Sequence, residues 1–115
     1  AREVKKSIPM MEKAAAKSDE GELYVRLGNV YLDGDQFTKA ADSVEKGLKK
    51  GGVKRPDQAR LVLGMAYFNL GEYNKARRAF REVGKDDRSA KYSKQWIAYV
   101  TSEEDRQREL EKDLF

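Results

Sequence analysis

Apolar residues recur along most of the chain three or four positions apart, which is the spacing of one face of an α-helix. Phe37, Ala40 and Val44 form one such series, and Trp96 and Val100 belong to another. We therefore predict an all-α fold. The expected helices cover residues 2–17, 20–33, 36–50, 56–70, 73–84 and 88–111.

The pattern contains an internal repeat with a period of 36 residues. The motif Leu-Gly-x-x-Tyr occupies residues 27–31 and recurs at residues 63–67, and an aromatic residue and an alanine follow each copy at equal distances. A glycine inside a helix costs about 1 kcal/mol relative to alanine. Gly28 and Gly64 therefore predict that another helix approaches closely at both positions. The matched residues after the motif are Phe37 with Tyr73 and Ala40 with Ala76.

These residues resemble the tetratricopeptide-repeat (TPR) family, whose unit of about 34 residues is a helix-turn-helix with leucine, glycine, tyrosine and alanine at such positions. The resemblance implies a right-handed superhelical array of antiparallel helix pairs, an α-solenoid, with a C-terminal capping helix. The loop at residues 50–54 is expected to hold the residues in excess of the family period. The implied single domain, 1–115, comprises the second helix of a truncated repeat (1–19), two repeats (20–52 and 56–88) and the capping helix (89–112).

Five further glycines are interpreted as breaks between helices. Gly34 and Gly71 lie in turns between paired helices, where we expect each to end a helix in the left-handed conformation. Gly47, Gly51 and Gly52 lack the strand context and spacing of a phosphate-binding loop. We expect these three to form a flexible linker between repeats.

The chain contains no cysteine and no histidine. Thiolate sites, the commonest general base at neutral pH and the commonest ligand of transition metals are therefore excluded. Asp33 and Asp35 lack the third acidic position and the distal glutamate of a calcium loop. The acidic run at 103–105 is interpreted as a solvated helix face, and nothing supplies a nucleophile with an adjacent base. We expect no enzyme activity, no catalytic residue, no cofactor and no metal site.

The chain carries 24 basic and 20 acidic residues, a formal net charge of +4. Two basic groups suggest an alternative function, an electrostatic adaptor for an anionic polymer or surface such as nucleic acid or a membrane. Acidic neighbours dilute both groups and no aromatic residues interleave with them, which disfavours nucleic acid. No apolar run approaches the roughly 20 residues that span a bilayer. The groups are Lys46, Lys49, Lys50, Lys54 and Arg55, and Arg77, Arg78, Arg81 and Lys85.

The resemblance to the TPR family also implies a concave groove lined by the first helix of each pair. Apolar residues outnumber charges on this wall, so it suits an apolar or helical peptide. The same residues would also suit ordinary core between helices. Family members that clamp a C-terminal carboxylate use lysine, asparagine and arginine there, and only Asn29 fits that pattern. The predicted wall comprises Val25, Asn29, Leu32, Leu61, Met65, Phe68 and Asn69, continued by Gln95 and Tyr99.

The favoured function is a non-catalytic protein-protein interaction module or scaffold, which binds a peptide or protein partner or mediates self-association. Residues 94–100 are in addition similar to the closing segment of some bacterial TPR proteins that accompany TonB-type energy-transduction systems of the cell envelope. This similarity implies a bacterial protein with a periplasmic or cell-envelope location.

Overall fold

The computed structural model describes residues 2–114, with side chains from residue 7 onward, and this part of the chain contains six helices. Every predicted helix is present, and its ends lie within three residues of the predicted ones. The last helix differs most, because it continues to Leu114 instead of ending near residue 111. The helices are α1 (Arg2–Lys17), α2 (Glu22–Asp33), α3 (Phe37–Lys50), α4 (Pro56–Asn69), α5 (Tyr73–Val83) and α6 (Ala90–Leu114).

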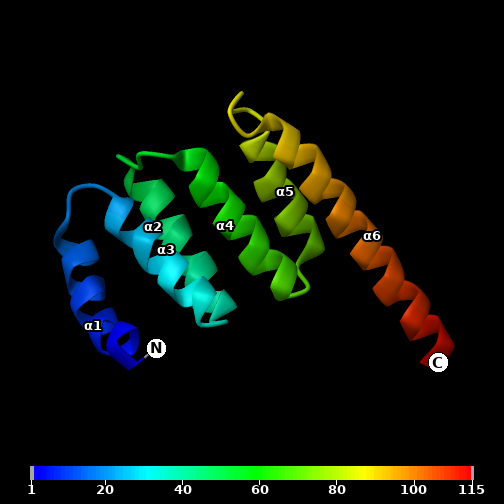
Figure 1. Ribbon diagram of the computed structural model, residues 1–115, viewed down its shortest axis with the longest axis horizontal. Coiled ribbons are helices and arrows are strands. Elements are labelled where there is room, and N and C mark those ends of the chain that lie inside the picture. Colours follow the sequence, from blue (N-terminus) through cyan, green and yellow to red (C-terminus); the bar gives the residue numbers. More distant parts are fainter. Residues whose placement is uncertain (1, 115) are drawn as a thin grey trace.

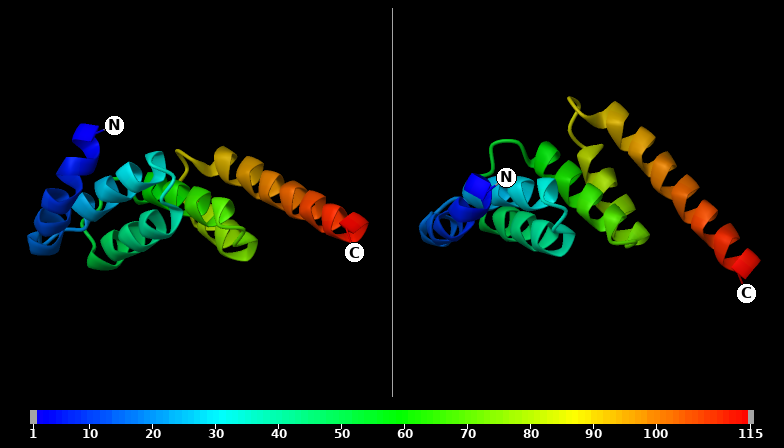
Figure 2. Two further views of the ribbon diagram at one scale, coloured as in Figure 1. Left: turned by 90° about the horizontal axis from the view of Figure 1, so that it is seen from below. Right: turned by 60° about the horizontal axis from the view of Figure 1, so that its bottom comes forward.

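The helices follow one another across the molecule in chain order (Figure 1). Each helix packs against the next, most extensively in the pairs α2 with α3 and α4 with α5, and α2 also contacts α4. The molecule measures 49 × 34 × 20 Å. Since a helix with its side chains is about 10 Å wide, the shortest dimension holds two layers of helix. The fold is thus all-α, a TPR-like array of sequential helix pairs ending in a long helix that extends beyond its neighbours (Figure 2).

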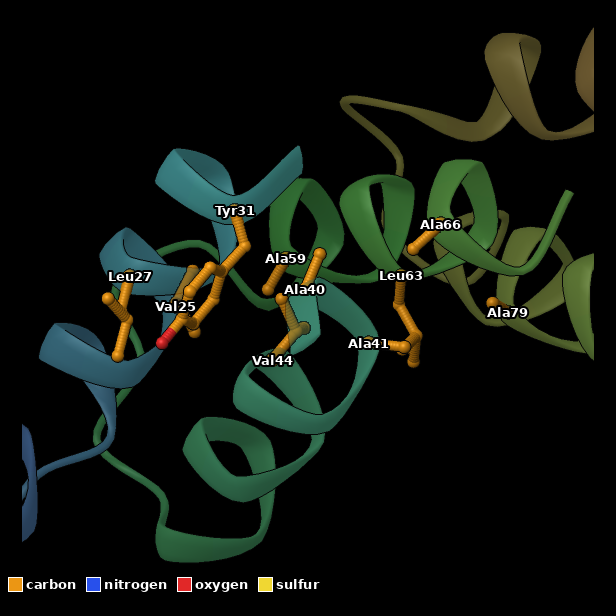
Figure 3. Close-up of a cluster of buried hydrophobic side chains, with 10 residues drawn as sticks. All are labelled: Val25, Leu27, Tyr31, Ala40, Ala41, Val44, Ala59, Leu63, Ala66 and Ala79. Carbon is orange, nitrogen blue, oxygen red and sulfur yellow. The ribbon is translucent and has the colours of Figure 1, made fainter. Parts of the chain in front are cut away.

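The larger of two clusters of buried side chains joins α2, α3 and α4 and includes Ala79 of α5 (Figure 3). Ala40 and Val44 of α3 are fully buried within it. The second cluster joins α5 to α6 and includes Phe80 and Val100, both also fully buried. Tyr67 packs against both clusters. Because the clusters share this contact, the helix pairs are held by one connected core.

Gly28 and Gly64 lie where another helix comes closest. A Cβ atom placed on Gly28 would lie 2.4 Å from Val44 Cγ2, and one placed on Gly64 would lie 2.5 Å from the Phe80 ring. Optimal contacts between carbon atoms are about 3.5–4.0 Å, so neither position has room for a side chain. The predicted close approach of helices at these two glycines is confirmed.

The turns inside the two helix pairs use different residues in the left-handed conformation. Gly71 has φ of +75°, as predicted, whereas Gly34 has φ of −92°. The left-handed residue of the first turn is Asp35, with φ of +58°. The prediction for Gly34 was wrong because the position equivalent to Gly71 in the repeat is Asp35, and aspartate tolerates this conformation better than most residues.

The prediction that Gly47 belongs to a flexible linker is also wrong. Gly47 is a buried residue of α3, and a Cβ there would lie 2.7 Å from the carbonyl oxygen of Gly21. The two glycines let the backbone of α3 touch the start of α2. Only Gly51 and Gly52 lie in the loop, both with positive φ, and Gly51 accepts a hydrogen bond from the Gly21 N–H at 2.6 Å.

A tyrosine on α2 and its equivalent on α4 each bond to a glutamate in the preceding helix. Tyr31 of α2 donates its hydroxyl hydrogen to Glu12 Oε1 of α1 at 2.6 Å, and Tyr67 of α4 donates to Glu45 of α3. Burial and the adjacent carboxylate raise the pKa of both tyrosines, that of Tyr31 to about 12. These bonds connect successive helix pairs across the array.

Alkaline pH is expected to weaken the contact between α1 and α2. Free tyrosine ionises near pH 10, whereas Tyr31 stays protonated until about pH 12. The stability that this raised pKa contributes is complete below about pH 10 and is lost as pH rises through about 12. An ultraviolet-difference titration should show late ionisation of Tyr31 and Tyr67, and Tyr31→Phe should remove the part that belongs to Tyr31. Ionisation of all six tyrosines near pH 10 would contradict the buried hydrogen bond.

Candidate partner-binding site

A cavity of about 330 Å³ opens between α2, α4 and α6. Two of its sides are the last turns of α2 and α4, and a third is the N-terminal half of α6. The turn from α2 to α3 and the start of α3 also line it. The lining residues are Leu32, Asp35, Phe37, Met65, Phe68, Asn69, Trp96 and Tyr99.

Aromatic rings form the wall that α6 contributes. The rings of Tyr99 and Phe68 are in tilted contact, with centroids 5.2 Å apart. The Trp96 ring packs edge-on against Tyr99, with centroids 6.0 Å apart. Trp96 also stacks on the fully buried Phe80 at 5.2 Å. Tyr99 nevertheless keeps 51% of its surface exposed. Trp96 therefore joins this wall to the core, whereas Tyr99 exposes about half of its surface to the solvent.

Polar contacts hold α6, and with it this wall, against α5. The buried Ser93 hydroxyl donates to the Phe80 carbonyl oxygen at 2.6 Å. Further along α6, Arg77 Nη1 of α5 lies 2.9 Å from Glu104 Oε1. These contacts lie on either side of Trp96 and Tyr99 in the sequence, so they set the position of both rings.

A buried aspartate anchors the turn before α6. Asp57, in the first turn of α4, accepts two hydrogen bonds from Arg55, at 2.9 and 2.7 Å, and one from the Ser89 hydroxyl at 2.6 Å. Arg88 Nη2 lies 3.8 Å from the same carboxylate. The bonds from Arg55 and Ser89 hold the pKa of Asp57 far below its ordinary value, although burial acts in the opposite direction. The start of α6 is thereby joined to the start of α4.

Five of the residues predicted for the groove come together at the cavity. Gln95 lies beside it in an adjoining pocket formed with Trp96 and Tyr99. The structure thus brings six of the nine predicted residues to one region on three helices. The five at the cavity are Leu32, Met65, Phe68, Asn69 and Tyr99.

The other three predicted groove residues lie elsewhere. Val25 is only 8% exposed and packs in the core, where its position faces Gly47 of α3. Leu61 is half-buried against the cluster that contains Phe80. Asn29 is exposed, and its side-chain amide donates to the Val25 carbonyl oxygen at 3.3 Å.

Three residues of the cavity are absent from the predicted wall. Trp96 lies three positions before Tyr99, so the helical spacing of α6 signals its place beside that ring. Asp35 comes from the turn between α2 and α3, and Phe37 is the first residue of α3. Their position depends on how the turn folds over α4, which no periodicity in the sequence encodes.

Most of the basic residues proposed for an anionic partner make contacts within the protein. Arg55 binds Asp57, Arg77 binds Glu104, and Lys85 Nζ lies 2.9 Å from Glu82 Oε1. Lys50 donates to the carbonyl oxygens of Ala15 and Ala16 at 3.1 and 3.2 Å, and Lys46 lies over the Tyr24 ring. Three of the nine basic residues are thus paired with carboxylates, which reduces the positive charge of both groups and weighs against the alternative function as an electrostatic adaptor.

Among the residues described, no group of three or more carboxylates is placed to hold a metal ion. Within the same part of the chain, no helix combines the length and apolar character needed to cross a membrane.

Comparison with known proteins gives one match. Residues 57–83 match a family model described as a tetratricopeptide repeat. The matched segment runs from the first turn of α4 to the end of α5 and so covers one helix pair. No curated protein and no solved structure matches the chain significantly. One helix pair of this chain is thus similar to a tetratricopeptide repeat, a unit typical of non-catalytic protein-interaction modules.

Proposed function

We propose that this chain binds a peptide or protein partner on the face formed by α2, α4 and α6, with an apolar side chain of the partner in the cavity. The exposed aromatic wall carries the proposal. Tyrosine and tryptophan are enriched where protein partners bury their anchors. Tyr99 is half-exposed although Phe68 and Trp96 already fix its ring. A pre-positioned ring of this kind loses little freedom on binding.

The arrangement of the helices supports the same proposal. Arrays of stacked helix pairs present extended concave surfaces, on which partners are bound by non-covalent contacts alone. Within this proposal, residues 20–52 and 56–88 act as repeats that build the face, and residues 89–112 close it. Helix α1, packed against α2, serves in this proposal as a further second helix of the array. A second copy of this chain is one protein that the face can bind.

Replacing Tyr99 by alanine is expected to weaken partner binding about tenfold or more, because truncating an anchor residue costs about 2 kcal/mol. Partners would be captured with the immobilised protein from an extract of the native organism and then purified. Trp96 is the only tryptophan and lines the cavity, so its fluorescence reports the affinity of each partner directly.

Tyr92→Ala is the matched control. Tyr92 lies on the same helix with a similar exposed fraction, 43%, but it does not line the cavity. We expect this variant to bind as the unchanged protein does, with the same thermal midpoint. Equal losses from the two variants, or full binding by Tyr99→Ala, would refute the proposed site.

A location in the bacterial cell envelope, beside a TonB-type system, remains a prediction from residues 94–100 alone, and the comparisons do not support it. Fractionation of the native cells tests it. Recovery of the protein with the cytoplasmic fraction would exclude that location without touching the proposed binding face.

A further inference from the structure

We infer that the partner segment bound at the cavity is basic as well as apolar. An aliphatic or aromatic side chain fills the cavity, and a neighbouring lysine or arginine lies against Asp35 and the C-terminal ends of α2 and α4. This inference rests on the proposed function and adds to it the charge of the partner.

The rim of the cavity carries one charged side chain, and it is acidic. Asp35 is the only aspartate, glutamate, lysine or arginine among the eight lining residues. Within residues 7–114, no lysine or arginine nitrogen lies within 4.0 Å of its carboxylate. The negative charge of Asp35 is therefore available to a partner.

The helix ends beside the cavity add to this negative potential. The C-terminus of a helix carries a partial negative charge, which basic residues in the last turn usually offset. The last turns of α2 and α4 contain no basic residue, and α2 ends on the acidic Asp33. By contrast, α3 and α5 do carry basic residues in their last turns. The two helices that end at the cavity are thus the two that leave this charge uncompensated.

The backbone of Asp35 provides a separate indication. Its φ of +58° is a conformation that favours glycine, and the equivalent turn of the next pair has Gly71 there. Aspartate tolerates this conformation better than most residues do, but glycine adopts it without steric cost. Asp35 thus places a carboxylate at the cavity where glycine would fit the backbone better.

The aromatic rim also suits a cation. Exposed tyrosine and tryptophan faces attract lysine and arginine side chains, and Tyr99 and Trp96 line the same cavity as Asp35. Arg106 follows these two residues on the same helix, but it is paired with Glu103. That pair adds no net positive charge to repel a basic partner.

Two synthetic peptides test the inference. Both have blocked ends, no tryptophan and leucines at helical spacing, and they differ only in carrying lysine or glutamate at the remaining charged positions. Titration is followed by Trp96 fluorescence. We expect the lysine peptide to bind about tenfold more tightly. The difference should shrink towards none in about 1 M salt, where charges are screened within about 3 Å.

Asp35→Asn is expected to reduce the preference for the lysine peptide about threefold, since an exposed charge pair contributes modestly. Asparagine also adopts the left-handed conformation, so the turn is kept. Asp19→Asn is the matched control, because it removes an equal charge from the exposed turn before α2, at the opposite end of that helix from the cavity.

The outcomes separate this inference from the proposed function. Equal binding of both peptides, tighter binding of the glutamate peptide, or an equal effect of Asp19→Asn would overturn the basic partner and leave the binding face in place. If neither peptide changes Trp96 fluorescence, the apolar binding face itself is overturned.

Discussion

Replacing Gly64 by leucine is expected to lower the free energy of unfolding by about 3 kcal/mol, measured by urea denaturation. The first atom of the new side chain would lie 2.5 Å from the Phe80 ring. Phe80 is fully buried and stacks on Trp96, so its ring cannot move aside without disturbing α6. Helix propensity alone favours leucine over glycine by somewhat under 1 kcal/mol. A decrease in the free energy of unfolding would therefore show that the clash with Phe80 outweighs the gain in helix propensity.

Gly34→Ala is the control for this substitution. Its new Cβ would lie 3.6 Å from the nearest atom, the Val30 carbonyl oxygen, and its φ of −92° suits any residue. We expect an unchanged or slightly higher urea midpoint, because alanine restricts the unfolded chain more than glycine does. A Gly64→Leu protein that unfolds at the original midpoint would contradict the close helix contact.

The fold follows from local signals that the sequence contains in duplicate. The motif at residues 27–31 and 63–67 predicted both the helices and the glycines at which they touch, because the cost of a helical glycine demands a packing reason. The contact between Gly21 and Gly47 was missed, since it joins positions without a counterpart in the second repeat. Asp35 was missed because the left-handed position was assigned to the obvious glycine, Gly34, one residue earlier.

The candidate site was predicted in part for the same reason. Leu32 lies on α2, and Met65 and Phe68 lie on α4, the first helices of the two pairs. Their helical spacing predicted that they face the same side of the array. Val25 has the same spacing, but α3 covers it through the close contact at Gly47.

The cavity also depends on how α6 lies against α5, which buried polar contacts decide. Serines and charged residues that make such contacts look like ordinary surface residues in a sequence.

Asp57 is the clearest such residue, and its replacement by alanine is expected to lower the free energy of unfolding by about 3 kcal/mol. The carboxylate is 2% exposed, so its loss leaves the buried Ser89 hydroxyl without an acceptor. This loss of stability lies at the lower end of the range for a broken buried ion pair. The Arg55 side chain is 37% exposed, so water can solvate its charge once the carboxylate is gone. Asp86→Asn is the control: Asp86 binds the exposed Arg88, so we expect a much smaller change.

The stability that Asp57 contributes is also expected to decrease at acidic pH. The pKa of Asp57 is ordinarily 3.8 and lies well below that in the folded chain. The unfolded chain therefore takes up the proton first as pH falls, so the stability from this group is complete above about pH 5 and decreases as pH falls through 3.8 towards the folded pKa. Urea denaturation across this range should show a shallower acid dependence for Asp57→Asn. Because Ser89 and Arg88 connect Asp57 to the turn before α6, Trp96 fluorescence in the variant should also change before the helices unfold. Identical acid profiles for the variant and the unchanged chain would exclude Asp57 as the anchor of the aromatic wall.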